Sequence, residues 1–241
     1  VDIVFLGEVL FSDKISGVID RYNERQALVP TGRVFKVDFR RSGAENKPFH
    51  TLCIYDESCI NVRPPCVIQD WLSLSSDQDG KYYRTGQRYD FNMPAPLGLT
   101  SFYVVHWSQY SEEDGEAMKL LAAHQLRSQM CNWSRMPTVC LGDFNCEPHA
   151  KALAALGASR SLDYVLRRGG FFNPFWDFHS VGSIASENTR FLKTEFPVFD
   201  QILINKQIVV IPNISCEVEI FDDTVYRPFP GEHRPIVLKL V

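Results

Sequence analysis

Short apolar runs, each the length of a strand, make up most of the chain, and only a few helical patterns separate them. The first run, VDIVFLGEVLF, holds β-branched and aromatic residues with little polarity, which is typical of a buried strand. Similar runs predict strands over residues 33–39, 50–56, 66–74, 98–107, 137–145, 197–205, 208–214, 216–221 and 234–241. A chain with many strands and few helices is expected to place its helices outside packed sheets.

Three segments show helical features instead. After the cap-like Ser12, apolar residues recur at i, i+3, i+4 and i+7 through residues 12–25, which predicts an amphipathic helix. Residues 111–130 begin with acidic side chains, which the helix dipole favours in the first turn. Residues 148–157 predict a short helix that Gly157 closes.

The chain is expected to form one domain over residues 1–241. Its 241 residues, of which 45% are hydrophobic and 22% charged, suit a globular protein with a large core. The segments 75–87 and 167–183 are expected to be loops, and neither is a Pro/Gly-rich linker that would divide the chain.

The charge balance argues against a protein that depends on non-specific nucleic-acid affinity. The net charge is −4 and the isoelectric point about 5.9, and the only paired basic residues of note are Arg40-Arg41 and Arg167-Arg168. A phosphate partner is therefore expected to meet a local site, with a cation supplying charge. No apolar run approaches the roughly 18 residues of a membrane span, so no membrane-spanning segment is expected.

Seven cysteines, an odd number without a CxxC pair, disfavour both a zinc framework and a full disulfide set. They are expected to be buried small side chains in a reducing compartment, which favours a cytoplasmic location. The chain opens with Val1 inside a predicted strand and shows no signal peptide, and we expect that it is truncated at its N-terminus.

Several predicted strands end at a polar side chain. An ionised group in an apolar strand is costly unless it is paired or bound to a metal. Strand ends gathered at one rim would place these groups in a single cleft. Each residue also has a structural alternative: a helix cap, a satisfied histidine, an Asx turn in GDFN, or an ion pair with Arg. These residues are Glu8, His106, Asp143 with Asn145, Asp200, and Glu232 with His233.

The motifs DIVFLGEV, FYVVHW, VCLGDFNCEP, FNPFW, FDQILIN and EHRPIVLKL together resemble the endonuclease/exonuclease/phosphatase superfamily, which includes DNase I-like nucleases. GDFN is the most specific of them, and the resemblance runs from Glu8 to the C-terminus. It implies a four-layered α/β sandwich, in which helices flank two mainly antiparallel β-sheets. The superfamily begins with a strand ending in an Asn near the metal, and this sequence starts after it, so we expect that first strand to be missing from this chain.

The resemblance also implies a metal and its ligands. Glu8 matches a metal-binding Glu, and the hard carboxylate suits Mg²⁺, which Mn²⁺ can replace. Glu232 stands where the superfamily usually has Asp, and its longer side chain could still reach the metal.

Further roles follow from the same resemblance. Asp143 matches the residue that orients or deprotonates the attacking water, and Asn145 matches the amide that holds the scissile phosphate. His233 matches a histidine that contacts the phosphate, and Asp200 the carboxylate that orients it and favours its cationic form. His106 matches a second histidine found in the DNase I and sphingomyelinase branches.

Two residues are candidates for substrate binding. Trp176 could stack on a base or ring, or it could belong to an aromatic loop that covers the core, and Trp107 has the same two interpretations. Arg190, shortly before Asp200, could contact phosphate or be a solvated surface residue.

The sequence therefore predicts a Mg²⁺-dependent phosphodiesterase, a nuclease that cleaves DNA or RNA through metal-assisted attack by water. One alternative is a phosphatase or phosphodiesterase of a small-molecule or lipid head-group phosphoester, which the acidic charge favours. Another is an inactive binding module. The expected partner is nucleic acid or another phosphoester substrate, and no protein partner is identifiable.

Overall fold

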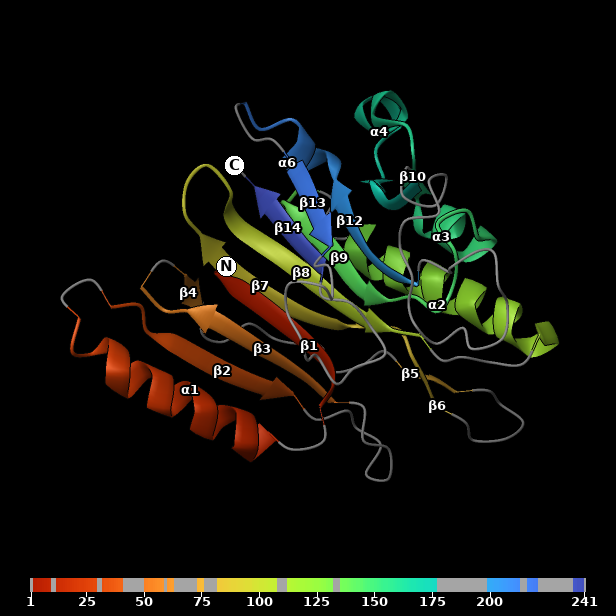
Figure 1. Cartoon of the computed structure of the whole chain (residues 1–241). Helices are drawn as coiled ribbons and strands as arrows, with labels where there is room; N and C mark the ends of the chain where they lie inside the picture. Colours follow the sequence, from red (N-terminus) through yellow and green to blue (C-terminus); the bar gives the residue numbers. More distant parts are fainter. Residues whose placement is uncertain are drawn as a thin grey trace.

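The structure is a computed structural model that describes residues 2–9, 12–29, 32–40, 50–58, 60–62, 73–75, 82–107, 112–131, 135–176, 199–212, 216–220 and 236–240. Within these residues, two sheets pack face to face, with helices outside them (Figure 1). The predicted fold class, a four-layered α/β sandwich, is confirmed.

The larger sheet has seven strands and carries most of the candidate residues. Its three central neighbours, β12, β9 and β8, combine one antiparallel and one parallel pairing. In sheet order the strands are β10 (Ala158–Ser159), β11 (Phe171–Phe172), β12 (Asp200–Asn205), β9 (Thr138–Asp143), β8 (Gly98–His106), β7 (Gln87–Met93) and β4 (Asn61–Val62).

The smaller sheet is fully antiparallel and has three strands in the order β1 (Ile3–Val9), β3 (His50–Asp56) and β2 (Phe35–Arg40). Two further antiparallel pairs join β13 (Cys216–Ile220) to β14 (Ile236–Leu240), and β5 (Ser73–Ser75) to β6 (Tyr82–Arg84).

The two sheets are held together by an aromatic core. Phe5 on β1 lies 5.4 Å, between ring centroids, from both Tyr89 on β7 and Phe102 on β8. The hydroxyl groups of Thr51 on β3 and Tyr89 are 2.7 Å apart, which adds a buried hydrogen bond between the sheets. Alternating strand residues supply this core because every second side chain points to the same face.

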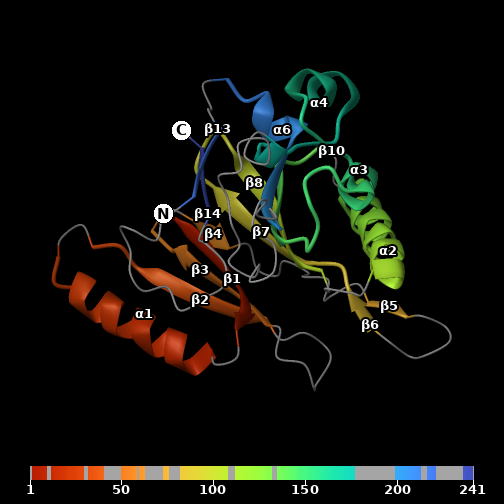
Figure 2. The ribbon, with the colours of Figure 1, turned by 45° about the vertical axis from the view of Figure 1, so that its right-hand side comes forward.

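Helices cover the outer faces. α1 (Ser12–Gln26) lies on the smaller sheet, where the rings of Tyr22 and Phe35 are 5.7 Å apart and the Asn23 side chain bonds both backbone groups of Phe35. α2 (Glu112–Cys131) and α3 (Lys151–Leu156) lie on the larger sheet and bury Leu126 and Leu153 there. Figure 2 shows α1 and the α2–α3 pair on opposite sides of the molecule. No helix in the described part of the chain is long and apolar enough to cross a membrane.

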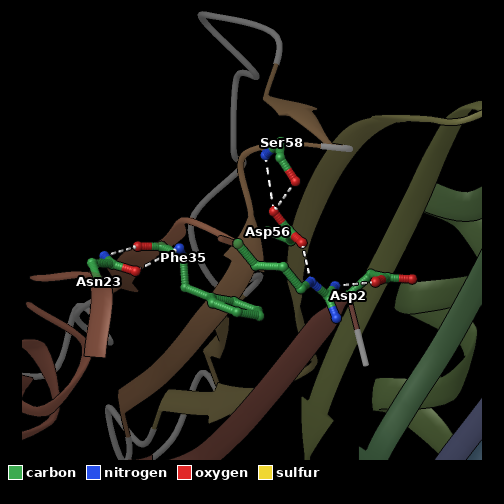
Figure 3. Close-up of polar contacts among 6 residues, drawn as sticks. Asp2, Asn23, Phe35, Asp56 and Ser58 are labelled. Carbon is green, nitrogen blue, oxygen red and sulfur yellow. Dashed lines mark hydrogen bonds and ion pairs between the residues drawn. The ribbon is translucent and has the colours of Figure 1, made fainter. Parts of the chain in front are cut away.

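A cluster of polar contacts fixes the start of β1 against the end of β3 (Figure 3). The guanidinium group of Arg33 donates to the carboxylates of both Asp56 and Asp2. Ser58 donates to the same Asp56 carboxylate through its backbone N–H at 2.9 Å and its hydroxyl at 2.5 Å. Burial raises the pKa of Asp56, but the hydrogen bonds from Ser58 and Arg33 outweigh this effect and lower it from 3.8 to about 2.

Three expectations need correction. Residues 208–214 were expected to be a strand, but Asn205 caps the short helix α6 (Lys206–Val209), accepting from the N–H of Ile208 at 3.4 Å. The expected loop 167–183 includes the last two residues of α4 (Leu162–Arg168) and the short strand β11. The expected loop 75–87 contains β6 and the start of β7. Of the predicted strand 66–74, residues 66–72 lie outside the described residues.

Candidate active site

Three of the predicted site residues lie side by side on neighbouring strands. The parallel pairing of β8 with β9 aligns His106 with Asp143, and the antiparallel pairing of β9 with β12 aligns Asp143 with Asp200. Their strands reach the same edge of the larger sheet because β8 and β9 end there and β12 begins there. The expectation that polar strand ends gather at one rim therefore holds for these residues.

The backbone of Glu8 approaches the same rim from the smaller sheet. Val9, the next residue, pairs with His50 at the start of β3. Thr51, the next residue of β3, contacts Tyr89 near the start of β7. Gln87, the first residue of β7, pairs with Val104 near the end of β8. The end of β1 and the end of β8 thus lie at corresponding ends of the two sheets (Figure 1).

Asp143 and Asn145 face each other across a tight turn. The Asn145 backbone N–H donates to Asp143 Oδ1 at 2.6 Å, and Asn145 Nδ2 donates to Asp143 Oδ2 at 3.0 Å. Asn145 has a φ of 47°, so the pair is brought together by a left-handed Asx-type turn and not by strand alternation. Phe144 points away, fully buried, with its ring 5.1 Å from that of Trp107.

His106 faces the Asp143 carboxylate. His106 Nε2 lies 3.8 Å from Asp143 Oδ2, and the two side chains are 17% and 15% exposed. A half-buried acid beside a histidine can accept a proton from a bound water or, with the histidine protonated, share its charge. This arrangement suits hydrolysis, in which a proton must leave the attacking water.

Glycine is required immediately before Asp143. Gly142 has a φ of 126°, and a Cβ built there would lie 2.1 Å from the carbonyl oxygen of Val105 on β8. A side chain at this position would push β8 and β9 apart. The glycine of the GDFN motif therefore keeps His106 and Asp143 in register.

Sequence reasoning missed two polar supports beneath this turn. Gln201, fully buried on β12, donates to the carbonyl of Cys146 at 2.7 Å and accepts from Asn173 Nδ2 at 2.8 Å. Lys119 on α2 donates to the carbonyl of Asn145. Gln201 could have been predicted to be a buried polar support, because it lies inside the apolar FDQILIN run. No feature of the sequence distinguishes Lys119 from the other charged residues of its helix.

The two candidate tryptophans differ in environment. Trp107 is 1% exposed and donates to the carbonyl of Thr85 at 3.0 Å, so it is a core residue. Trp176 is half-buried, with its ring centroid 6.1 Å from that of His149 and 5.7 Å from the guanidinium carbon of Arg160. His149 belongs to the segment that follows Asn145, so Trp176 borders the turn that carries the site.

The remaining predicted site residues, Arg190, Glu232 and His233, lie outside the described residues. Among the side chains that the structure describes, no group of three or more His, Cys, Asp and Glu residues is close enough to hold a metal ion. The described side chains do not form a metal site by themselves, so the prediction of Mg²⁺ depends on Glu8 and Glu232.

The prediction that the cysteines are buried is confirmed for the three whose side chains the structure describes. Cys53, Cys140 and Cys146 are buried and free of disulfides. Burial raises the pKa of Cys140 far above the ordinary thiol value and raises that of Cys146 to about 12. These thiols are therefore small packing groups, and the thiolate that metal binding or nucleophilic attack would need is strongly disfavoured.

Two stacked sheets with outer helices form a fold that this chain shares with solved structures, one of which is described as an endonuclease/exonuclease/phosphatase family protein. The resemblance noted from the motifs is thus confirmed at the level of the fold. No family model matches the sequence, and no curated protein matches it.

Solved structures share this fold at low sequence identity. A mannosyl-6-phosphatase from Bacteroides thetaiotaomicron is 13% identical with a TM-score of 0.58, and the match covers 100% of this chain and 85% of the phosphatase chain. The human Nocturnin catalytic domain with bound sulfate is 12% identical with a TM-score of 0.60, covering 100% and 81%. A truncated TDP2 from Caenorhabditis elegans is 13% identical with a TM-score of 0.60, covering 99% and 84%.

Proposed function

We propose that this chain is a phosphoester hydrolase, and more specifically a metal-dependent phosphodiesterase that cleaves nucleic acid. The observation that carries the proposal is the alignment of His106, Asp143 and Asp200 on three neighbouring strands at one rim. The fold supports it, because similar structures include one described as an endonuclease/exonuclease/phosphatase family protein and a mannosyl-6-phosphatase.

The proposed chemistry is an in-line attack of water on phosphorus. Asp143 accepts the proton of the water, since its carboxylate is half-buried and oriented by the turn at Asn145. His106, 3.8 Å from that carboxylate, contributes positive charge or a hydrogen bond where negative charge grows. Asp200 is proposed to orient His233, which would contact the phosphate.

Mg²⁺ is proposed as the cofactor, with Glu8 and Glu232 as its protein ligands. Carboxylate oxygens suit this hard cation, which usually keeps several waters and needs only one or two protein carboxylates. When bound, it would neutralise charge on the phosphoester oxygens.

Trp176 is proposed to contact the substrate next to the scissile phosphate, and Arg190 to add charge there. The indole lies beside His149 and Arg160, so an aromatic ring and two groups that can carry positive charge border the site turn. A nucleobase could stack on the ring while the adjoining phosphate meets the cationic groups. Trp176→Ala is then expected to raise KM for RNA or DNA but not for bis-p-nitrophenyl phosphate.

The deciding experiment compares the protein with its Asp143→Ala variant, each with Mg²⁺ or with EDTA. The substrates are supercoiled plasmid, single-stranded RNA and bis-p-nitrophenyl phosphate. Metal-dependent cleavage of plasmid or RNA that the variant loses would support the nuclease. No turnover of any ester would refute the enzyme and favour the inactive binding module.

A small-molecule or lipid head-group phosphoester is the second candidate substrate. The net charge of −4 favours it, as does the likeness of fold to a mannosyl-6-phosphatase. Salt separates the two candidates, because nucleic-acid binding weakens steeply as salt rises and binding of a small ester much less. Turnover of the small ester alone, at a rate insensitive to 50–200 mM salt, would select this candidate.

A further inference from the structure

The indole ring of Trp176 is not oriented by a hydrogen bond of its own. Its N–H is buried and forms no hydrogen bond within the described structure. The ring has His149 and Arg160, from two different segments of the chain, as neighbours. Its position therefore depends on packing and on the backbone that leads to it, residues 171–175.

Two buried amide side chains connect this backbone to the turn of the GDFN motif. The Phe175 N–H donates to Asn173 Oδ1 at 3.0 Å, and Asn173 Nδ2 donates to Gln201 Oε1 at 2.8 Å. Gln201 Nε2 donates to the carbonyl of Cys146 at 2.7 Å. Because Cys146 directly follows the motif, a chain of three hydrogen bonds connects the turn to the residue before Trp176.

The orientation of both amides is fixed by the two ends of this chain. A carbonyl can only accept and a backbone N–H can only donate, so Cys146 and Phe175 determine which end of each amide is the NH₂ group. Turning either amide by 180° would place two donors together at one contact and two acceptors at the other. Asn173 is 1% exposed and Gln201 is 0% exposed, so solvent does not replace a lost bond. Hydrogen bonds in a buried chain also strengthen one another, which makes the connection stiff.

Asn173 is bonded on the other side of Trp176 as well. Its backbone N–H donates to the carbonyl of Ser159 at 2.9 Å. Ser159 directly precedes Arg160, whose guanidinium carbon lies 5.7 Å from the centroid of the Trp176 ring. Asn173 is thus connected to both segments that supply neighbours of the ring, directly to one and through the second amide to the segment that contains His149.

We propose that Asn173 and Gln201 are positioning residues that hold the Trp176 ring beside the site turn, and that through this ring they determine selectivity. A phosphodiester that carries a nucleobase gains a stacking contact, and one without a base does not. This inference rests on the proposed nuclease function and deepens it, because it assigns the preference for base-bearing substrates to two buried amides that do not contact the substrate.

The kinetic test compares a short single-stranded oligonucleotide with the same sugar–phosphate backbone built from abasic units. The two chains carry the same charge and differ only in their bases. Asn173→Ser keeps a hydroxyl that can accept from the Phe175 N–H but is too short to reach Gln201. Base stacking is worth about 5- to 150-fold in binding, so displacing the ring should raise KM for the oligonucleotide about 5- to 20-fold. The KM for the abasic chain, and kcat for both, should stay within about twofold.

The matched control is Asn205→Ser. Asn205 lies at the other end of β12 and is 6% exposed. Its Oδ1 accepts from the nearby Ile208 N–H at 3.4 Å and from the distant Thr138 N–H at 3.0 Å. Serine can keep the local bond there and lose the distant one, as at Asn173. We expect both variants to unfold at lower urea concentration than the parent, but only Asn173→Ser to change KM.

The Trp176→Ala background shows whether the effect acts through the ring. There, Asn173→Ser should change KM for the oligonucleotide by less than about twofold, because the group that it positions is gone. An unchanged KM in the single variant Asn173→Ser would overturn the proposal. An equal rise in KM for the abasic chain, or the same rise in Asn205→Ser, would also overturn it.

A second readout does not depend on activity. The indole N–H resonance of Trp176, identified by its absence in Trp176→Phe, should shift in the NMR spectrum of Asn173→Ser and stay in place in Asn205→Ser. If it shifts but neither chain is cleaved, the positioning of the ring stands and the proposed nuclease function fails. If it stays in place in Asn173→Ser, the positioning proposal fails whatever the activity.

Discussion

Replacing Asp56 with asparagine tests how strongly the Arg33 cluster stabilises the fold. The Asp56 side chain is 1% exposed, and its pKa is lowered from 3.8 to about 2. A lowering of this size corresponds to at most about 2.5 kcal/mol of stability at neutral pH. Arg33 is 39% exposed and solvent screens the pair, so we expect a loss of about 1 kcal/mol for Asp56→Asn at pH 7.

The pH dependence has a definite sign. A carboxyl group whose pKa is lower in the folded state stabilises the fold above its unfolded pKa, and this stabilisation is lost as the pH falls. For Asp56 the loss should occur between about pH 4 and pH 2. Urea unfolding at several pH values should therefore show the parent protein and Asp56→Asn converging over this range.

Asp163→Asn is the matched control for this prediction. Asp163 pairs with Arg167 at 3.0 Å, but the two side chains are 68% and 76% exposed. Such a surface pair contributes about 0.3–0.5 kcal/mol, so this variant should unfold almost like the parent. A constant gap between the parent and Asp56→Asn from pH 7 to pH 2 would refute the reasoning, because the lowered pKa would then contribute nothing.

Three further predictions concern the site and its supports. Asp143→Asn should lower kcat by at least about 100-fold, because the amide cannot accept the proton of the water, while the melting temperature changes little; phosphoester assays and calorimetry check this. Trp107→Phe should cost about 1 kcal/mol in urea unfolding, because it removes the buried hydrogen bond to the Thr85 carbonyl. Cys146, whose pKa burial raises to about 12, should resist iodoacetamide at pH 8 until urea unfolds the chain, as mass spectrometry would show.

Strands with a buried face could be predicted where the apolar residues of the sequence coincide with the buried positions of the structure. The run at 50–56 coincides with β3, the middle strand of the smaller sheet, in which Leu52 and Cys53 are fully buried. β7 was not predicted, although Arg88, Asp90 and Asn92 alternate with its buried residues as in a strand that buries one face. Arg88 and Asp90 are paired at 2.8 Å, a compensation that the linear sequence does not display.

The helix α6 shows the opposite error. Residues 208–214 have the composition of a strand, yet Asn205 at the end of β12 caps a helical turn there and also accepts from the Thr138 N–H at 3.0 Å. A side chain that holds β9 and starts α6 at once is a tertiary constraint, and it outweighs the strand propensity of Ile208 and Val209. Local pattern alone could not have revealed it.

The candidate site residues stand out in the sequence more clearly than the residues that support them. His106, Asp143 and Asp200 are conspicuous because each ends or begins an apolar strand, where an ionisable group is costly. Lys119 lies on a helix with many charged residues, and only the folded structure shows its ammonium group at the Asn145 carbonyl. Ionisable residues at the ends of apolar strands can thus stand out in a sequence, while a residue that contacts them from a helix often does not.

The register of the larger sheet also explains why the polar residues fall where they do along the chain. β8 and β9 are parallel, so both must end at the same edge, and the connection between them crosses the sheet through α2. The crossover that aligns His106 with Asp143 is the same one that places Lys119 over the following turn. Gly142 lets the two strands approach closely at that point. The geometry of the candidate site is therefore a consequence of one β8–α2–β9 unit, to which β12 adds Asp200 from the neighbouring position.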